Sequence, residues 1–181
     1  MKFELLSVKF RIDFSLFLII AVALILKYEN IIYLILFSSL HELGHITMLY
    51  LLGGKADEIT VAYYGIGLRH SELLSPCCDM VFLLSGAAVN IVLCLIGISK
   101  EINFSLALIN LLPLYPLDGG RAFKVLLNSA FSLNVSDSIM TVASFVFTSL
   151  ILVCSIVLRN ISLALISLYI VYYSINFKRF I

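Results

Sequence analysis

The sequence predicts an all-α polytopic membrane protein with about six transmembrane helices and a small β-sheet or hairpin on the cytoplasmic side. The 181-residue chain is 62% hydrophobic and 13% charged, so it has more apolar surface than a soluble domain of this length can bury. In two polar stretches, the residue pattern is that of β-strands and not of helices. The apolar residues gather in six segments, near 13–27, 31–51, 81–99, 102–117, 138–158 and 160–177.

The basic residues orient these helices. With six spans, Lys27, Lys100 and Arg159 lie on one side of the bilayer and the other nine of the 12 Lys and Arg residues lie with the termini. Cytoplasmic loops are enriched in Lys and Arg, so we expect a multi-pass protein of the cell membrane with both termini in the cytoplasm. The first apolar segment is interpreted as a retained helix, because its small-residue triplet Ala21-Val22-Ala23 lies inside the apolar run.

The two predicted strand regions are residues 9–14 and 57–69. The second is rich in β-branched and aromatic residues and is interrupted by Gly65 and Gly67, as in a hairpin. Two roles remain open for these strands. They either cap the helices as a small structural sheet or handle a substrate.

Composition also excludes several classes of protein. A net charge of +1 without a basic stripe argues against a nucleic-acid partner. The four cysteines include an adjacent pair and two residues inside apolar runs, which is not the pattern of a disulfide framework or a thiolate metal site. The chain contains no GxSxG nucleophile motif, which disfavours a serine hydrolase.

The motif "HELGH" at 41–45 is the strongest chemical signal. His41 and His45 are four residues apart and share one face of a helix, with Glu42 beside them. This HExxH arrangement binds zinc through both imidazoles, and its glutamate serves as the base that activates water. His41 lies roughly 15 Å into the second apolar segment, where ionisable groups are costly without a metal or partners. The alternative is a polar network between helices, which does not explain the spacing.

Asp118 is the candidate third ligand. It lies at the cytoplasmic end of the fourth apolar segment, after Pro113 and Pro116 interrupt the helix. Gly119 and Gly120 follow it and permit close backbone approach. The alternative is a helix-terminal aspartate paired with Arg121.

These motifs resemble those of the site-2 protease family of intramembrane zinc metalloproteases. The family combines an HExxH helix with a later NxxPxxPLDGG segment whose aspartate is the third zinc ligand. A third segment, "SGAAVN" at 85–90, is similar to the family's Gly-Pro-x-x-Asn pattern but has Ala87 where proline is usual. The NxxPxxPLDGG motif is intact in this chain, in Asn110, Pro113, Pro116, Leu117, Asp118, Gly119 and Gly120.

The resemblance implies a zinc metalloendopeptidase formed by one membrane-embedded domain, 1–181, without a PDZ or CBS domain. Its catalytic core covers about 9–130, and the helices over 138–177 are accessory. The compact layout is most similar to the stage IV sporulation FB-type branch, whose members cleave a membrane-associated sigma-factor precursor. The expected partners are such a substrate, the lipid bilayer and a membrane-protein regulator.

In the implied site, His41, His45 and Asp118 bind Zn²⁺ and Glu42 is the general base. Substrate-binding roles are assigned to Asn110, Pro113 and Pro116, and Asn90 either contacts substrate or forms an interhelical hydrogen bond. The substrate would be held extended at a strand edge from 57–69. The alternative functions are a six-helix metal transporter with His41, His45 and Asp118 as its transit site, and an inactive relative that only binds membrane proteins.

Overall fold

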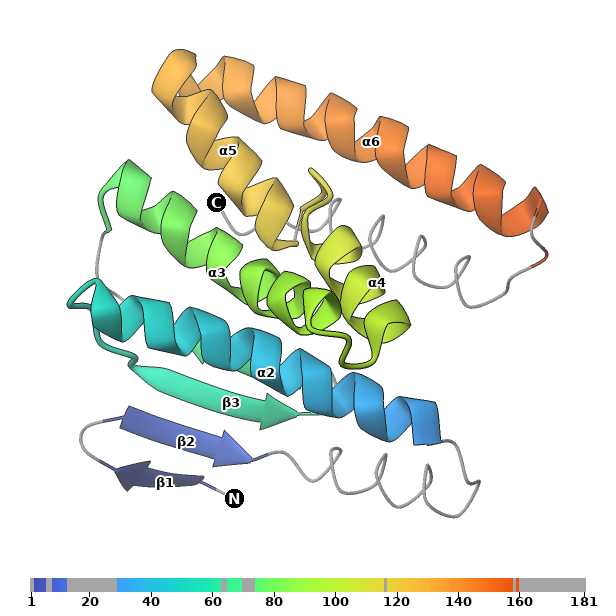
Figure 1. Cartoon of the computed structure of the whole chain (residues 1–181). Helices are drawn as coiled ribbons and strands as arrows, with labels where there is room; N and C mark the ends of the chain where they lie inside the picture. The colour runs from blue at the N-terminus through green and yellow to red at the C-terminus, as the bar shows by residue number, and fades with distance from the viewer. Residues whose placement is uncertain are drawn as a thin grey trace. The chain divides into compact units, whose positions relative to one another are not determined.

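The computed structural model describes residues 2–5, 8–12, 29–62, 65–69, 74–115, 117–157 and 159 (Figure 1). The chain divides into two compact units, Met1–Leu108 and Ile109–Ile181. The first and sixth predicted membrane segments, 13–27 and 160–177, lie outside the described residues. The described elements are β1 (Lys2–Leu5), β2 (Val8–Ile12), α2 (Glu29–Leu51), β3 (Glu58–Ala62), β4 (Gly65–Arg69), α3 (Pro76–Leu95), α4 (Lys100–Asn110), α5 (Asp118–Ala130) and α6 (Leu133–Val157).

Three described helices are long and apolar enough to cross a membrane, and they comprise Asn30–Leu51, Pro76–Leu95 and Leu133–Val157. Their outer surfaces are apolar: Leu95 is 78% exposed and Phe145 is 74% exposed. Such surfaces suit lipid better than water, as expected for a multi-pass membrane protein.

The fourth predicted segment, 102–117, is not one continuous span. Helix α4 ends at Asn110 after 11 residues, and α5 begins only at Asp118. An 11-residue helix is about 16 Å long, whereas the hydrocarbon core is about 30 Å thick. The structure therefore places a break where the sequence has its two prolines, and a separate helix after it that sequence analysis did not predict.

Helices α2 and α3 pack closely. The buried residues of α2 recur every four positions, at Phe37, His41, His45 and Leu49, and form a single stripe. A Cβ atom at Gly44 would lie 2.7 Å from a methyl group of Val89 and 3.0 Å from the Ser85 carbonyl oxygen. The glycine inside HELGH therefore lets the two backbones approach, as small residues do between membrane helices.

Helix α3 begins earlier than the apolar run suggests, at Pro76 rather than near residue 81. Ser75 is its N-cap and accepts a hydrogen bond from the Cys78 amide at 3.3 Å. Proline at the first helical position and Asp79 in the first turn complete a favourable helix start. The polar cap thus adds a turn before the apolar residues.

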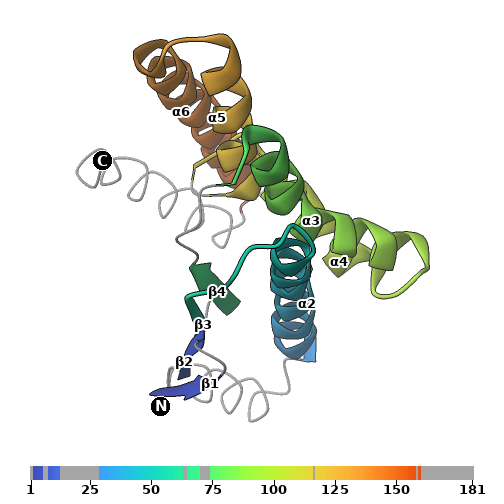
Figure 2. The same ribbon diagram turned by 90° about the vertical axis from the view of Figure 1, so that its left-hand side faces the viewer.

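The four strands form one sheet in the order β1-β2-β3-β4. The outer pairs, β1/β2 and β3/β4, are antiparallel, whereas β2 and β3 are parallel and α2 lies between them in the chain. The regions expected to form strands contribute β2, β3 and β4. Strand β3 is internal, and β4 is a terminal strand that lies against α2 (Figure 2).

The second unit contains the start of α5 and its packing against α6. A Cβ atom at Gly119 or Gly120 would collide with the backbone of Leu111 or Leu114, respectively. The two glycines therefore let the loop over 111–115 fold onto the first turn of α5. Lys124 on α5 forms an ion pair with Asp137 on α6 at 2.9 Å.

Candidate metal centre

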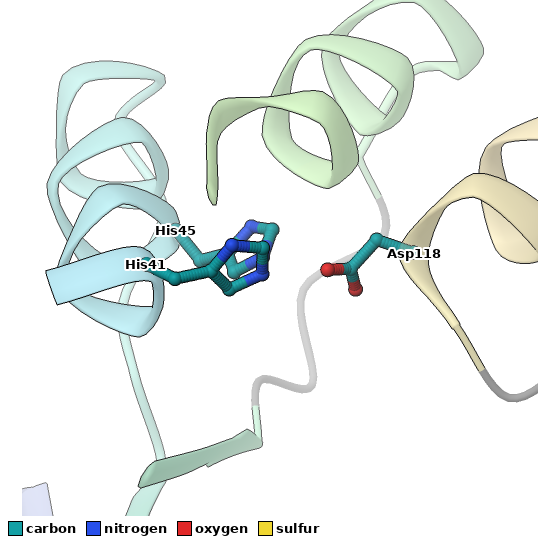
Figure 3. A group of neighbouring side chains, drawn as sticks. All are labelled: His41, His45 and Asp118. Carbon is teal, nitrogen blue, oxygen red and sulfur yellow. The ribbon is translucent and has the colours of Figure 1, made fainter. Parts of the chain in front are cut away.

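The two histidines of HELGH converge in the first unit. His41 and His45 are 3% and 4% exposed, and their Nε2 atoms are 3.2 Å apart. Both rings project from the same face of α2 (Figure 3). The predicted one-face arrangement is therefore present in the folded protein.

Hydrogen bonds to α3 determine which nitrogen of each ring carries the proton. His41 Nδ1 lies 2.7 Å from the side-chain oxygen of Asn90, and His45 Nδ1 lies 2.8 Å from the Phe82 carbonyl oxygen. Carbonyl oxygens only accept hydrogen bonds, so each Nδ1 must donate. In the neutral imidazoles, each Nε2 then has a lone pair suitable for a metal ion.

The separation of these nitrogens fits a zinc ion. Two nitrogens bound to one tetrahedral zinc at about 2.0–2.1 Å lie roughly 3.3–3.4 Å apart. The Nε2 atoms are 3.2 Å apart. Two lone pairs at this distance repel unless a cation lies near both, so the donor chemistry and the spacing both favour a metal.

Gly86 leaves room at the tips of the rings. A Cβ atom there would lie 2.6 Å from His41 Nε2 and would also collide with His45 Nε2. The rings have little freedom to move away, because each Nδ1 is hydrogen-bonded to α3. Gly86 belongs to the segment 85–90, but its role at the rings depends on helix packing and was not predicted.

Glu42 and Asp118 are less enclosed than the histidines. Glu42 follows His41 on α2 and is half-buried. Asp118 is the first residue of α5 in the second unit and is also half-buried. An acidic residue is favourable at a helix N-terminus, because the helix dipole is positive there.

The remaining candidate residues differ in their surroundings. Asn90 is fully buried, and its side chain hydrogen-bonds to His41 on α2 and to Asn103 on α4. Asn110 ends α4, and Pro113 lies half-buried in the loop that follows. Pro116 lies outside the described residues.

The chain is similar to known metalloproteases. The model of peptidase family M50 matches residues 73–154. Zinc metalloprotease MJ0392 of Methanocaldococcus jannaschii is 25% identical over 189 residues, which cover 91% of this chain and 56% of that protein. The protein sll0528 of Synechocystis sp., named as a zinc metalloprotease, is 33% identical over 112 residues, which cover 50% of this chain and 30% of that protein. These matches support peptidase family M50.

A solved structure shares the fold. The site-2 protease from Methanocaldococcus jannaschii superposes with a TM-score of 0.67 over 96% of this chain and 93% of that chain, at 20% sequence identity. The chain thus has the fold of that protease, while it spans only 30% and 56% of the two curated relatives.

The M50 match and the HELGH motif are independent observations. The matched residues 73–154 include Asn90, Asn110 and Asp118 but begin after the histidine pair. Helix α2 carries that pair and packs against the matched region through α3. The zinc-binding geometry therefore adds support that the family match does not contain.

Proposed function

We propose that this chain is an intramembrane zinc metalloprotease of the site-2 protease type, which hydrolyses a peptide bond in or next to a transmembrane segment. The observation that carries the proposal is the pair of buried imidazoles on α2, with Nε2 atoms 3.2 Å apart and both Nδ1 atoms donating to α3. Similarity to the M50 family and to zinc metalloproteases supports it.

The proposed ligands are His41, His45 and Asp118, each of which offers one ligand atom (Figure 3). Two imidazoles and one carboxylate are a typical set for a catalytic zinc, which also keeps a position for water or substrate. Zinc, when bound, supplies Lewis-acid activation of water and of the peptide carbonyl.

Glu42 is the proposed proton carrier. Its carboxylate takes a proton from the attacking water and later delivers it to the amine that leaves when the peptide bond breaks. The protons balance, because the one removed from water ends on the new amino group. Asn110 and the loop with Pro113 and Pro116 are proposed to contact the extended substrate.

Strand β4 is the proposed docking edge for substrate. A peptide bond in a helix is shielded by its own hydrogen bonds, so the substrate must become extended before cleavage. Strand β3 already pairs with β2 and β4, whereas β4 ends the described sheet and lies against the helix that bears HELGH. An extended peptide can add to such an edge by β-augmentation.

A sigma-factor precursor or a similar membrane-associated regulator is the proposed substrate. This rests on the compact motif layout and its similarity to the sporulation branch. Cleavage is proposed on the cytoplasmic side. A cut site mapped to the outer half of a substrate helix would contradict that side.

The first experiment compares wild type with Glu42→Gln for zinc content and for cleavage of a panel of single-span and membrane-associated substrates. Glutamine keeps the shape but cannot accept the proton, so cleavage should fall by about 10²–10⁴-fold with zinc unchanged. Equal cleavage by both proteins would exclude Glu42 as the base.

The same samples test the transporter alternative. Transport has no specific need for a carboxylate at position 42, whereas hydrolysis needs a base. If both proteins move zinc into liposomes and neither cleaves a substrate, the chain is a metal transporter and the protease proposal is wrong.

A further inference from the structure

We propose that Asn103 is a positioning residue of the metal centre, which acts through Asn90 to hold the His41 imidazole in its metal-binding tautomer. The proposal rests on the proposed function only for the identity of the metal. Asn103 lies on α4 and belongs to neither motif. Both asparagines are fully buried in the first unit, where polar side chains need partners.

A hydrogen-bond relay runs from Asn103 through Asn90 to His41, and it starts at the turn between α3 and α4. The Asn103 side-chain nitrogen donates to the Ile98 carbonyl at 2.9 Å and to the Ser99 carbonyl at 3.5 Å. Gly97 and Ser99 have positive φ angles of 91° and 38° in this turn. Backbone carbonyls only accept, so the amide nitrogen of Asn103 must face the turn and its oxygen must face the other way.

The side-chain oxygen of Asn103 determines the orientation of the Asn90 amide. The Asn90 nitrogen donates to it at 2.8 Å and lies 3.5 Å from the Phe37 carbonyl oxygen. If the Asn90 amide were reversed, two oxygens would face each other without a proton in a buried site. The Asn90 oxygen therefore faces His41.

The last link sets the tautomer. Because the Asn90 oxygen accepts at 2.7 Å, His41 must hold its proton on Nδ1. The lone pair of Nε2 then faces the corresponding atom of His45. Outer partners of this kind fix the orientation of a metal-binding histidine, and their loss typically costs 10–100-fold in metal affinity or activity.

The decisive measurement is the ¹⁵N NMR spectrum of the His41 side chain in the zinc-free wild-type protein in nanodiscs. The relay requires the Nδ1–H tautomer. A spectrum of the Nε2–H tautomer would overturn the proposal without any variant. This readout is independent of proteolysis, so a chain that cleaves nothing could still have the relay, and the two proposals fail separately.

Two substitutions at Asn103 separate positioning from folding. Asn103→Leu removes the acceptor for Asn90, and we expect zinc affinity, measured by chelator competition, to fall about 10–100-fold with a mixture of His41 tautomers. Asn103→Asp in its protonated form keeps an acceptor oxygen for Asn90 and a hydroxyl that donates to the Ile98 carbonyl, so affinity and tautomer should stay close to wild type. Equal losses in both variants would mean that Asn103 only supports the turn.

A matched control and a double substitution complete the test. Ala107→Gly loosens α4 at a buried position one turn away without touching the relay, and it should leave the tautomer and the zinc affinity unchanged. Asn90→Leu combined with Asn103→Leu should bind zinc no worse than Asn90→Leu alone, because Asn103 acts through Asn90. Additive losses would overturn the relay.

Discussion

At the residue scale, the candidate metal centre depends on small side chains as much as on its ligands. Gly44 lets α2 approach α3, and Gly86 leaves the space in which the imidazole tips meet. The hydrogen bonds of His41 and His45 to α3 then hold the rings in place. The proposed zinc site thus depends on contacts from α3 as well as on the HELGH motif of α2.

Gly86→Ala should abolish zinc binding. The added methyl group would collide with both Nε2 atoms, and the rings cannot turn away without breaking a hydrogen bond. Zinc content after purification is the measurement. Ala88→Val, which adds bulk at an exposed position of the same helix, should retain the metal. Full zinc occupancy in Gly86→Ala would show that the metal does not lie between the imidazoles.

Asp118→Asn should weaken zinc binding more than the 10–100-fold expected for an outer partner, because the amide brings no negative charge to the ion. Chelator competition measures the change. Asp137→Asn is the control, since that carboxylate forms only a half-exposed ion pair with Lys124 and contributes about 0–1 kcal/mol to stability. An unchanged affinity in Asp118→Asn would remove Asp118 from the ligand set.

At the element scale, the break between α4 and α5 and the edge strand β4 have the clearest functional consequences. The break puts Asp118 at the start of a helix, with two glycines against the backbone of the preceding loop. Strand β4 provides a terminal edge of the described sheet next to α2. In the proposed function, each of these elements contributes a contact to the extended substrate.

Proline substitutions in β4 test the docking edge. Successive N–H groups of a strand point in opposite directions, so one of Gly67→Pro and Leu68→Pro removes an N–H directed at β3 and the other removes one on the open edge. If substrate adds to this edge, both variants should lose cleavage while zinc content stays unchanged. Wild-type cleavage by both variants would exclude docking on β4.

At the scale of the whole molecule, three helices among the described residues have the length and apolar composition of membrane spans. Helix α3 connects the polar segment after α2 to the turn before α4, so its two ends should lie on opposite sides of the bilayer. The distribution of Lys and Arg predicts which end is cytoplasmic.

Labelling tests this topology. In a cysteine-free background, Lys100→Cys should react with an impermeant maleimide in intact cells, and Lys55→Cys should react only after permeabilisation. Both positions are exposed, so reagent access to the side chain is not limiting. The reverse pattern would invert the predicted orientation and move the expected cleavage side.

Local patterns in the sequence were enough to predict the membrane class and the shared face of His41 and His45. Apolar composition indicates that a segment lies in lipid, and a four-residue spacing indicates that two residues share one helix face. Neither inference requires knowledge of any other segment. The strand regions were also recognisable, because β-branched residues and glycines act locally.

Only the tertiary structure decided which atoms those residues present. The ring protons of His41 and His45 depend on hydrogen-bond partners 49 and 37 positions away along the chain, and the relay adds a contact between Asn90 and Asn103, 13 positions apart. The space at Gly86 likewise depends on the two distant histidines. The helix after the proline break likewise follows from a loop that folds back onto Gly119 and Gly120. Hydrogen bonds and close contacts between distant segments exist only once the helices pack, so no period or spacing in the chain could have specified them.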